Sequence, residues 1–335
     1  MIEARGASAH RKKDPLIEKV LLDMVAPETA GDPMSEQKWV RRSLRSLSEE
    51  LGQAGHDASA PTVSRLLKKH DYSLRVNAKE KESSSQHPER DTQFRYIETQ
   101  KQSFAASGDP YISVDTKKKE LIGNFKNAGQ AWCQEAEAVN VHDFLSDALG
   151  RVSPYGIFDM KRNEGVVYVG QSADTPEFAV EAITRWWQEY GQAAYPEATR
   201  LLILADSGGS NGCRPRLWKE QLQSQLSDAL GLSVTVCHYP TGCSKWNPIE
   251  HRLFSQISIN WAGKPLRTFE TMLGLIRGTT TQSGLKVLAH MLEGVFEKGK
   301  KVTDAVMKTL NMTRHETCPQ WNYTIHPRLG HTSGE

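Results

Sequence analysis

The feature that most constrains the fold is an alternation of short apolar strands with amphipathic helices, which begins at Tyr111. Strand-like segments are predicted at residues 111–114, 155–158, 166–169, 201–205 and 234–237. Helices with apolar residues at helical spacing are predicted at residues 176–190, 214–230 and 248–261. This order predicts a layered α/β fold with a mixed sheet, and residues 116–154 are expected to form an insertion between the first two strands.

Three acidic residues stand where such a fold can bring them together. Asp115 and Asp206 each directly follow a predicted strand, and Glu250 lies in the first turn of a predicted helix. Carboxylates are ligands that Mg²⁺ and Mn²⁺ favour. Two such ions about 3.5–4 Å apart can activate a nucleophile and stabilise the leaving oxygen in a displacement at phosphorus. The pattern therefore indicates a metal-dependent phosphodiester site.

Each acid also has an ordinary structural explanation. An Asp that follows a strand is often a turn residue or a helix cap. Residues 247–250 (Asn-Pro-Ile-Glu) fit a capping box, with Asn247 at the N-cap, Pro248 at the first helical position and Glu250 at the third. The residues alone leave both interpretations open.

A second candidate region lies nearer the N-terminus. Residues 36–75 have the pattern of an all-α helix-turn-helix region, in which Val63, Leu66 and Leu67 form the apolar face of a basic second helix. The DNA-binding residues expected there are Thr62, Ser64, Arg65, Lys68 and Lys69. The alternative is a small helical bundle whose Lys and Arg side chains are merely solvated.

Charge is distributed unevenly although the whole chain carries a net charge of only +2. Residues 61–81 hold six basic and two acidic side chains, and residues 263–310 hold eight basic and four acidic ones. Residues 155–260 between them hold nine basic and eleven acidic side chains. Basic flanks around an acidic middle favour an anionic partner. The expected domains are a flexible leader (1–14), a helical DNA-binding region (15–75), a Ser-rich linker (76–92), a catalytic core (93–262) and a basic C-terminal extension (263–335).

Residues close to the acids in sequence suggest further contacts with DNA. Lys117 and Lys118 follow Asp115, while Lys245 and Trp246 precede Glu250. Lysines can contact phosphates and Trp246 can stack on an unpaired base, although solvated charges and a packed aromatic are ordinary alternatives.

Several other classes of protein are disfavoured. Residues 207–212 (SGGSNG) are not followed by Gly-Lys-Ser/Thr, so a nucleotide-binding P-loop and a nucleotide cofactor are not expected. Cys237, His238 and Cys243 lack an evident fourth ligand for zinc. The five Cys include no Cys-x-x-Cys pair, and no apolar run approaches the length of a membrane span. A cytoplasmic protein is expected.

Six longer stretches resemble the ISAzo13-type insertion-sequence transposases. They lie at residues 79–97, 112–127, 185–191, 202–223, 237–257 and 313–327, and include LILADSGGSNGCRPRLWKEQLQ and CHYPTGCSKWNPIEHRLFSQI. The resemblance covers roughly residues 14–327. Members often begin with a further helical DNA-binding segment, so the short leader predicts a truncated or differently initiated copy.

The resemblance implies a DDE transposase core of the RNase H-like fold. It assigns catalysis and metal binding to Asp115, Asp206 and Glu250, and Glu250 stands 44 positions after Asp206. It also implies two Mg²⁺ or Mn²⁺ ions, double-stranded DNA partners (terminal inverted repeats and target DNA), strand transfer, and a homo-oligomer on DNA. The alternatives are a nuclease of this fold without strand transfer, and an inactive or domesticated DNA-binding protein.

Overall fold

The computed structural model describes residues 14–25, 30–31, 38–39, 43–70, 72, 87–130, 135, 137–140 and 145–328. The chain divides into two compact units, Met1–Glu80 and Lys81–Glu335. The expected leader, apart from Asp14, and most of the expected linker lie outside the described residues. The last residues of that linker belong instead to helix α4 (Arg90–Ser107). None of the described helices is long and apolar enough to cross a membrane.

The described part of the first unit contains three helices around a small apolar core. They are α1 (Ile17–Val25), α2 (Leu44–Gln53) and α3 (Ala60–Lys69), and strands β1 (Ala30–Gly31) and β2 (Lys38–Trp39) pair antiparallel. The core consists of Leu21, Val25, Leu47, Leu51, Ala58 and Val63. Ser43 begins α2 as an N-cap, since its hydroxyl accepts a hydrogen bond from the Ser46 amide at 3.0 Å. The predicted helices on either side of a turn are therefore present, and their use on DNA stays a prediction.

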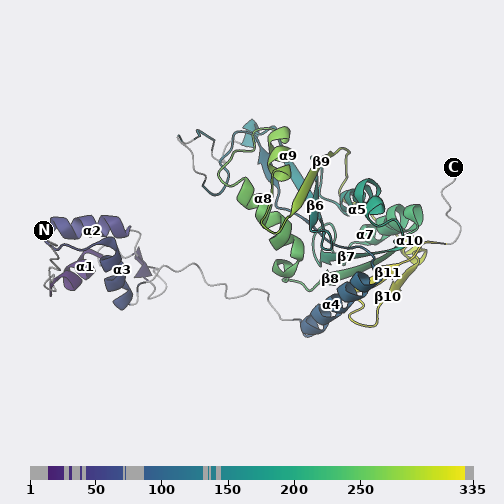
Figure 1. Ribbon diagram of the computed structural model, residues 1–335, viewed down its shortest axis with the longest axis horizontal. Helices are drawn as coiled ribbons and strands as arrows, with labels where there is room; N and C mark the ends of the chain where they lie inside the picture. The colour runs from purple at the N-terminus through teal and green to yellow at the C-terminus, as the bar shows by residue number, and fades with distance from the viewer. Residues whose placement is uncertain are drawn as a thin grey trace, which may run out of the picture. The chain divides into compact units, whose positions relative to one another are not determined.

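In the described residues, the second unit is built on one nine-stranded mixed sheet with the order β10-β11-β8-β7-β3-β5-β6-β9, in which β4 pairs with β5. Figure 1 shows several of these strands among the helices of the unit. The strands are β3 (Tyr111–Thr116), β4 (Glu120–Ile122), β5 (Gly150–Asp159), β6 (Glu164–Gly170), β7 (Arg200–Asp206), β8 (Ser233–Tyr239), β9 (Lys286–Leu292), β10 (Met312–Arg314) and β11 (Asn322–Ile325). Strands β3, β7 and β8 run parallel, and β5 is antiparallel to β3 and β6. The five predicted strands and the mixed α/β fold are confirmed.

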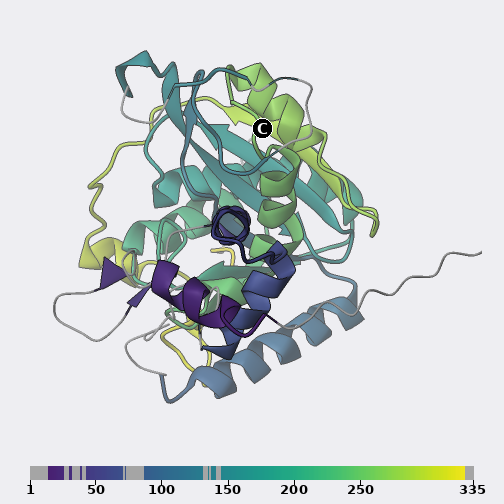
Figure 2. The same ribbon diagram turned by 90° about the vertical axis from the view of Figure 1, so that its left-hand side faces the viewer.

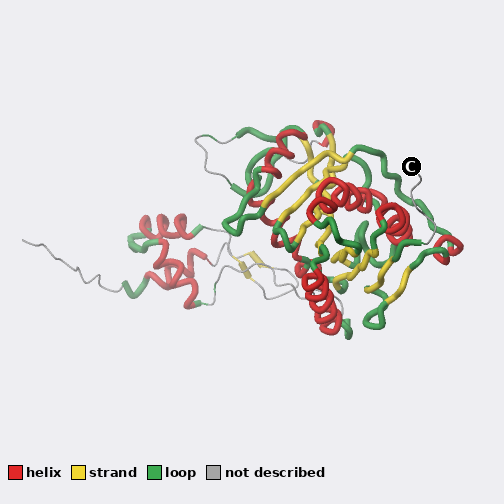
Figure 3. The backbone as a smooth tube through the Cα atoms, turned by 45° about the vertical axis from the view of Figure 1, so that its right-hand side comes forward, coloured by secondary structure: helices red, strands yellow, loops and turns green. Residues whose placement is uncertain are grey.

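Helices cover both faces of this sheet (Figure 3). One face packs against α5 (Pro176–Trp186), α7 (Arg216–Gln221) and the π-helical turns η4 (Leu222–Asp228). The other packs against α4, the long helix at the lower edge of Figure 2, and against η6 (Glu250–Phe254), α8 (Ser255–Asn260) and α9 (Phe269–Arg277). Alternating residues of β7 pack on the two faces of the sheet. Leu201 and Ile203 lie on the α5 side, and Leu202 and Leu204 lie on the α4 side.

Shorter elements complete the second unit. They are η2 (Leu145–Asp147), the π-helical η3 (Trp187–Gly191), α6 (Gln192–Ala194), η5 (Ser244–Trp246) and α10 (Asp304–Lys308).

Two expected boundaries differ from the structure. Residues 263–335 were expected as a separate extension, but β9 pairs with β6 and β11 pairs with β8, so the core sheet does not end at residue 262. The excess of basic residues in this region gave no sign of β9, in which the alternate residues Val287 and Ala289 are buried. The insertion between the first two strands is also shorter than expected, because β3 runs to Thr116 and β5 begins at Gly150.

Candidate active site

Asp115 and Asp206 lie side by side at the carboxyl ends of two parallel strands. Ser113 of β3 is in register with Leu204 of β7, which brings the residues two positions further along each strand to the same edge of the sheet. Because alternate residues of a strand share a face, both carboxylates lie on the face that α4 and η6 cover. The sheet topology therefore accounts for the pairing of acids that are distant in sequence.

Glu250 is brought to this edge by a close contact between a helix and the sheet. Gly156 of β5 pairs directly with Asp115. A Cβ atom at Gly156 would lie 2.5 Å from the Phe254 ring and 2.9 Å from the Ile249 side chain. The segment that carries Glu250 can therefore approach β5 only because residue 156 has no side chain. The role of Gly156 was not predicted, although a Gly inside a predicted strand is a recognisable signal of close approach.

The electrostatics of the three carboxyl groups are coupled. Burial, together with the charges of Asp206 and Glu250, raises the pKa of Asp115 to about 8. Burial and, to a smaller extent, the charge of Glu250 raise the pKa of Asp206 to about 6. The pKa of Glu250 is raised by burial as well. Three acids that disfavour each other's ionisation form a site that a bound cation would stabilise.

Asn247 ties the elements of the site together. Its Nδ2 donates to Asp206 Oδ1 at 3.1 Å and to the Val114 carbonyl at 3.2 Å, and its Oδ1 accepts from Ser113 Oγ at 2.5 Å. Ser113 Oγ in turn accepts from the Ile249 amide at 3.1 Å. The expected N-cap residue therefore directs its side chain to the strands, and the Asn247 carbonyl accepts from the Glu250 amide at 3.1 Å.

Lys117 lies inside the site and differs in this from its neighbour Lys118. The Lys117 side chain is only 10% exposed and pairs with Glu120 at 2.8 Å. Its Nζ lies 4.6 Å from the centre of the Trp261 ring, and its charge lowers the pKa of Glu250 against the effect of burial. Lys118 is exposed. The two lysines that were expected to contact phosphates therefore differ, because Lys117 is almost buried and Lys118 is exposed.

Trp246 and Lys245 form an exposed surface just before Glu250. The Trp246 side chain is 53% exposed although its ring meets the edge of the Phe94 ring of α4, with ring centres 6.0 Å apart. Lys245 Nζ lies 5.9 Å from the Trp246 ring centre. An accessible aromatic beside a lysine is the combination that the predicted stacking on a base requires.

The DNA-binding residues expected in the first unit differ in their exposure and in their ion pairs. Arg65 and Lys68 are exposed on α3, and Thr62 and Ser64 are half-buried. Lys69 pairs with both carboxylate oxygens of Glu18 at 2.8 Å, which links α3 to α1. All three cations of that helix are exposed, but within the described residues an ion pair is recorded only for Lys69.

Asp174 is a further acid near the site, and its presence there was not predicted. The Thr116 hydroxyl donates to Asp174 Oδ1 at 3.1 Å, and the charge of Asp174 adds to the raised pKa of Asp115. Its position just before α5 resembles an ordinary helix-start residue, so no pattern in the sequence marks it.

The donor set fits hard divalent cations in its chemistry. All three candidate ligands are carboxylates, which Mg²⁺ and Mn²⁺ prefer. Within the described ranges, no group of three or more His, Cys, Asp and Glu side chains is arranged to hold a metal ion as it stands. Cys237 and Cys243, the sulfur atoms considered for zinc, are buried in the apolar cluster beneath α4.

Comparisons with known proteins identify the family. The family described as "Rhodopirellula transposase DDE domain" matches residues 20–327. No curated protein matches the chain in sequence.

Among solved structures, three Mos1 complexes are similar and each covers 81% of this chain. The pre-cleavage Mos1 transpososome has 13% identity, a TM-score of 0.42 and 72% of its own chain covered. The paired-end complex with the left transposon end has 14% identity, a TM-score of 0.40 and 71% of its own chain covered. The Mos1 mariner paired-end complex with Mn has 12% identity, a TM-score of 0.40 and 72% of its own chain covered. These values are low, so the assignment rests on the sequence match over residues 20–327, and the chain belongs to the Rhodopirellula transposase DDE domain family, as its ISAzo13-type motifs indicated.

Proposed function

We propose that this transposase family member hydrolyses a phosphodiester at the end of a mobile element and then joins the released 3′-OH to target DNA. Asp115, Asp206 and Glu250 would hold two Mg²⁺ or Mn²⁺ ions for both steps. The observation that carries the proposal is the placement of these three partly buried, electrostatically coupled carboxyl groups at one edge of the sheet. When bound, the ions would supply activation of the attacking oxygen and stabilisation of the leaving oxygen.

The chain's own residues would orient this chemistry. Asn247 fixes the carboxylate of Asp206 relative to β3, and Lys117 lies beside Glu250 and offsets part of the negative charge. Trp246, Lys245 and Lys118 are accessible for contact with the DNA near the acids. Such fixed groups favour the transition state because they need little rearrangement during the reaction.

Recognition of the terminal inverted repeats is assigned to the first unit. Arg65 and Lys68 on α3 support this assignment because they are exposed on a helix that follows a helix and a turn. Two ends of an element must be paired before they are joined to one target, so the active form would be a homo-oligomer on DNA.

Asp206→Asn tests the catalytic proposal in the full chain. The substrate is a labelled duplex that carries one terminus of the element and its flanking DNA, incubated with Mg²⁺. We expect the variant to lose cleavage by several orders of magnitude while its affinity for the duplex changes less than about threefold, because one ligand of the ions is lost and no phosphate contact is removed. Unchanged DNA products with retained binding would support the DNA-binding protein instead.

A second substrate separates transposase from nuclease. A duplex whose end is already cleaved, with a free 3′-OH, is incubated with a supercoiled target plasmid. Joining to the plasmid is expected. Hydrolysis of the first substrate without any joining of the second would identify a nuclease of this fold that lacks strand transfer.

A further inference from the structure

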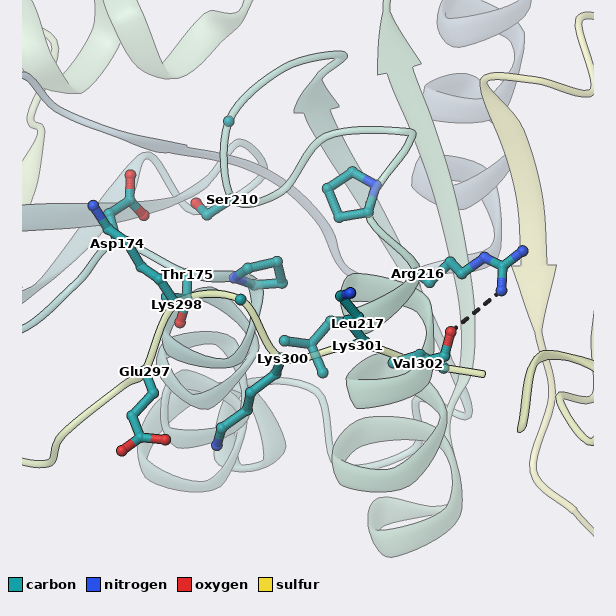
Figure 4. A pocket seen from close by; sticks show the side chains of 14 residues that line it. Asp174, Thr175, Ser210, Arg216, Leu217, Glu297, Lys298, Lys300, Lys301 and Val302 are labelled. Atoms are coloured by element: carbon teal, nitrogen blue, oxygen red, sulfur yellow. Dashed lines mark hydrogen bonds between the residues drawn. The ribbon is translucent and has the colours of Figure 1, made fainter. Parts of the chain in front are cut away.

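A cavity of about 590 Å³ lies directly beside the candidate active site. Figure 4 shows that its walls come from the start of α5, the loop after Asp206, the start of α7 and the segment between β9 and α10. The segment 297–302 (Glu-Lys-Gly-Lys-Lys-Val) runs across the beginnings of both helices in that view. The volume lies within the range of sites that bind ligands of nucleotide size, about 300–1,000 Å³.

The cavity is joined to Asp115 through Thr116. Asp174 and Ser210 line the cavity, and the Thr116 hydroxyl donates to Asp174 at 3.1 Å and lies 3.4 Å from the Ser210 hydroxyl. The Thr116 amide donates to Asp115 Oδ1 at 2.8 Å. A group bound in the cavity is thus separated from the carboxylate of Asp115 by a single residue.

The cavity has cations that an anion could reach, although the acids in and beside its lining balance its total charge. Its lining includes four cations (Arg216, Lys298, Lys300 and Lys301) and two acids (Asp174 and Glu297). Lys300 pairs with Glu177 at 2.7 Å, and Arg216 pairs with Asp304 at 2.6 Å and donates to the Val302 carbonyl at 3.2 Å.

These contacts anchor the segment at two points. Lys298 and Lys301, by contrast, are exposed and form no ion pair within the described part of the chain. Figure 4 shows the Lys298 side chain running toward the Asp174 side of the cavity.

The apolar part of the lining suits the sugar and base that accompany a phosphate. Pro176, Pro215 and Leu217 lie at the two helix starts. The cavity is on the α5 side of the sheet edge, while Trp246 is on the α4 side, where it meets Phe94. A DNA strand that crosses this edge would meet cations on one side, the three acids in the middle, and the exposed aromatic on the other.

We propose that this cavity binds the DNA strand next to the phosphodiester that is cleaved, with Lys298 and Lys301 in contact with its phosphates. The inference rests on the proposed function and adds a location and two residues to it. Phosphates near three carboxylates need compensating charge, and the anchored 297–302 segment supplies it.

The salt dependence of DNA binding tests the contact without any cleavage. The full-length Lys298→Gln/Lys301→Gln variant is compared with Lys286→Gln/Lys308→Gln, which removes two exposed lysines outside the cavity. The dissociation constant for a labelled 40-bp duplex of arbitrary sequence is measured from about 50 to 250 mM salt in the absence of divalent metal. Each phosphate contact contributes about 0.7–0.9 to the slope of log K against log salt.

We expect the cavity variant to lower the slope by about 1.4–1.8 and the control variant by less than about half of that. Equal slopes in the two variants would overturn the proposal. Equal thermal melting temperatures of the two variants show that both are folded, and thymidine monophosphate serves as a competitor. If micromolar thymidine monophosphate displaces the duplex, the cavity takes a free nucleotide and the proposal is wrong.

A second measurement locates the contact on the DNA. Single phosphates of the element-end duplex are replaced by neutral methylphosphonates. Replacements within a few nucleotides of the cleaved bond should weaken binding by the wild-type chain and have no further effect on the Lys298→Gln/Lys301→Gln variant. Sensitivity that persists in the variant, or that lies only far from the cleaved bond, contradicts the location. Because the slope is measured without cleavage, failure of the Asp206→Asn test would leave its result intact.

Discussion

At the scale of single residues, the site depends on a side chain that performs no chemistry. Asn247 is fully buried and bonds with β3, with Asp206 and, through its carbonyl, with the start of η6. Its side chain contacts the strands that carry Asp115 and Asp206, and its main-chain carbonyl contacts the element that carries Glu250. Its hydrogen bond also lowers the pKa of Asp206 against the larger effect of burial.

Replacing Asn247 with Ala should therefore disturb the position of Asp206 without weakening the binding of DNA. We expect Mg²⁺-dependent cleavage to fall on the order of 10- to 100-fold through misplacement of Asp206, while DNA affinity is retained. Stability should fall by about 1–3 kcal/mol because Ser113 and the Val114 carbonyl lose partners. Cleavage rates and urea unfolding are measured together.

Asn322→Ala is the matched control for this variant. Asn322 is equally buried and bonds with Gln93 at 2.6 Å, away from the acids. It should lose similar stability and keep its cleavage rate. An equal loss of cleavage in both variants would show that destabilisation alone explains the effect.

At the scale of elements, the approach of η6 to β5 sets the position of Glu250. Gly156→Ala would place a methyl group against Phe254 and Ile249, and overpacking of this kind costs about 1–3 kcal/mol. The segment must shift away from Asp115, so we expect cleavage to fall by more than the loss of stability explains. Shortening the opposing side chain in the double variant Gly156→Ala/Phe254→Leu should restore part of the cleavage rate.

The control for this element is Gly170→Ala. Its methyl group would lie 2.5 Å from the Phe178 ring of α5, so the overpacking is comparable, but it falls on the helix that does not carry Glu250. Cleavage that declines equally in both variants, in proportion to stability, would contradict a specific role for the contact between η6 and β5.

At the scale of the whole molecule, local patterns predicted more than long-range pairing. The five strands were predicted correctly because hydrophobic alternation is a local signal, and the proposal of Asp115, Asp206 and Glu250 as a triad came from family motifs that are local as well. The joining of β9 and β11 to the sheet was missed, since strand pairing across many residues leaves no local trace. The partnerships of Lys117 and Lys69 were missed for the same reason, because Trp261 and Glu18 are distant in sequence.

Closure of the second unit by its C-terminal segment provides a prediction at this largest scale. Asp228 of η4 accepts from the Arg328 amide and Nε at 2.9 Å each, and from Gln223 Nε2 at 2.8 Å. Burial opposes ionisation of Asp228 most strongly, yet these hydrogen bonds and the charge of Arg328 outweigh it, so its pKa is lowered from 3.8. The ionised carboxylate therefore holds the end of the sheet to η4.

A lowered pKa fixes the sign of the pH dependence. The stabilisation is complete above the ordinary pKa of Asp in the unfolded chain and is lost as the pH falls through the lower folded value. Asp228→Asn should reduce the free energy of unfolding by about 1–3 kcal/mol at pH 7, and the difference from the wild type should shrink below about pH 4. Urea unfolding followed by Trp fluorescence reports on this unit, since seven of the eight Trp residues follow residue 81.

The exposed ion pair between Asp304 and Arg216 is the appropriate comparison. Asp304 is 79% exposed, so Asp304→Asn should change the free energy of unfolding by less than about 1 kcal/mol at either pH. A difference for Asp228→Asn that is equally small, or that is independent of pH, would mean that β11 is held to β8 by backbone pairing and apolar packing alone. In that case the C-terminal segment would need no charged anchor, and its place in the sheet would follow from the burial of Tyr323 and Ile325.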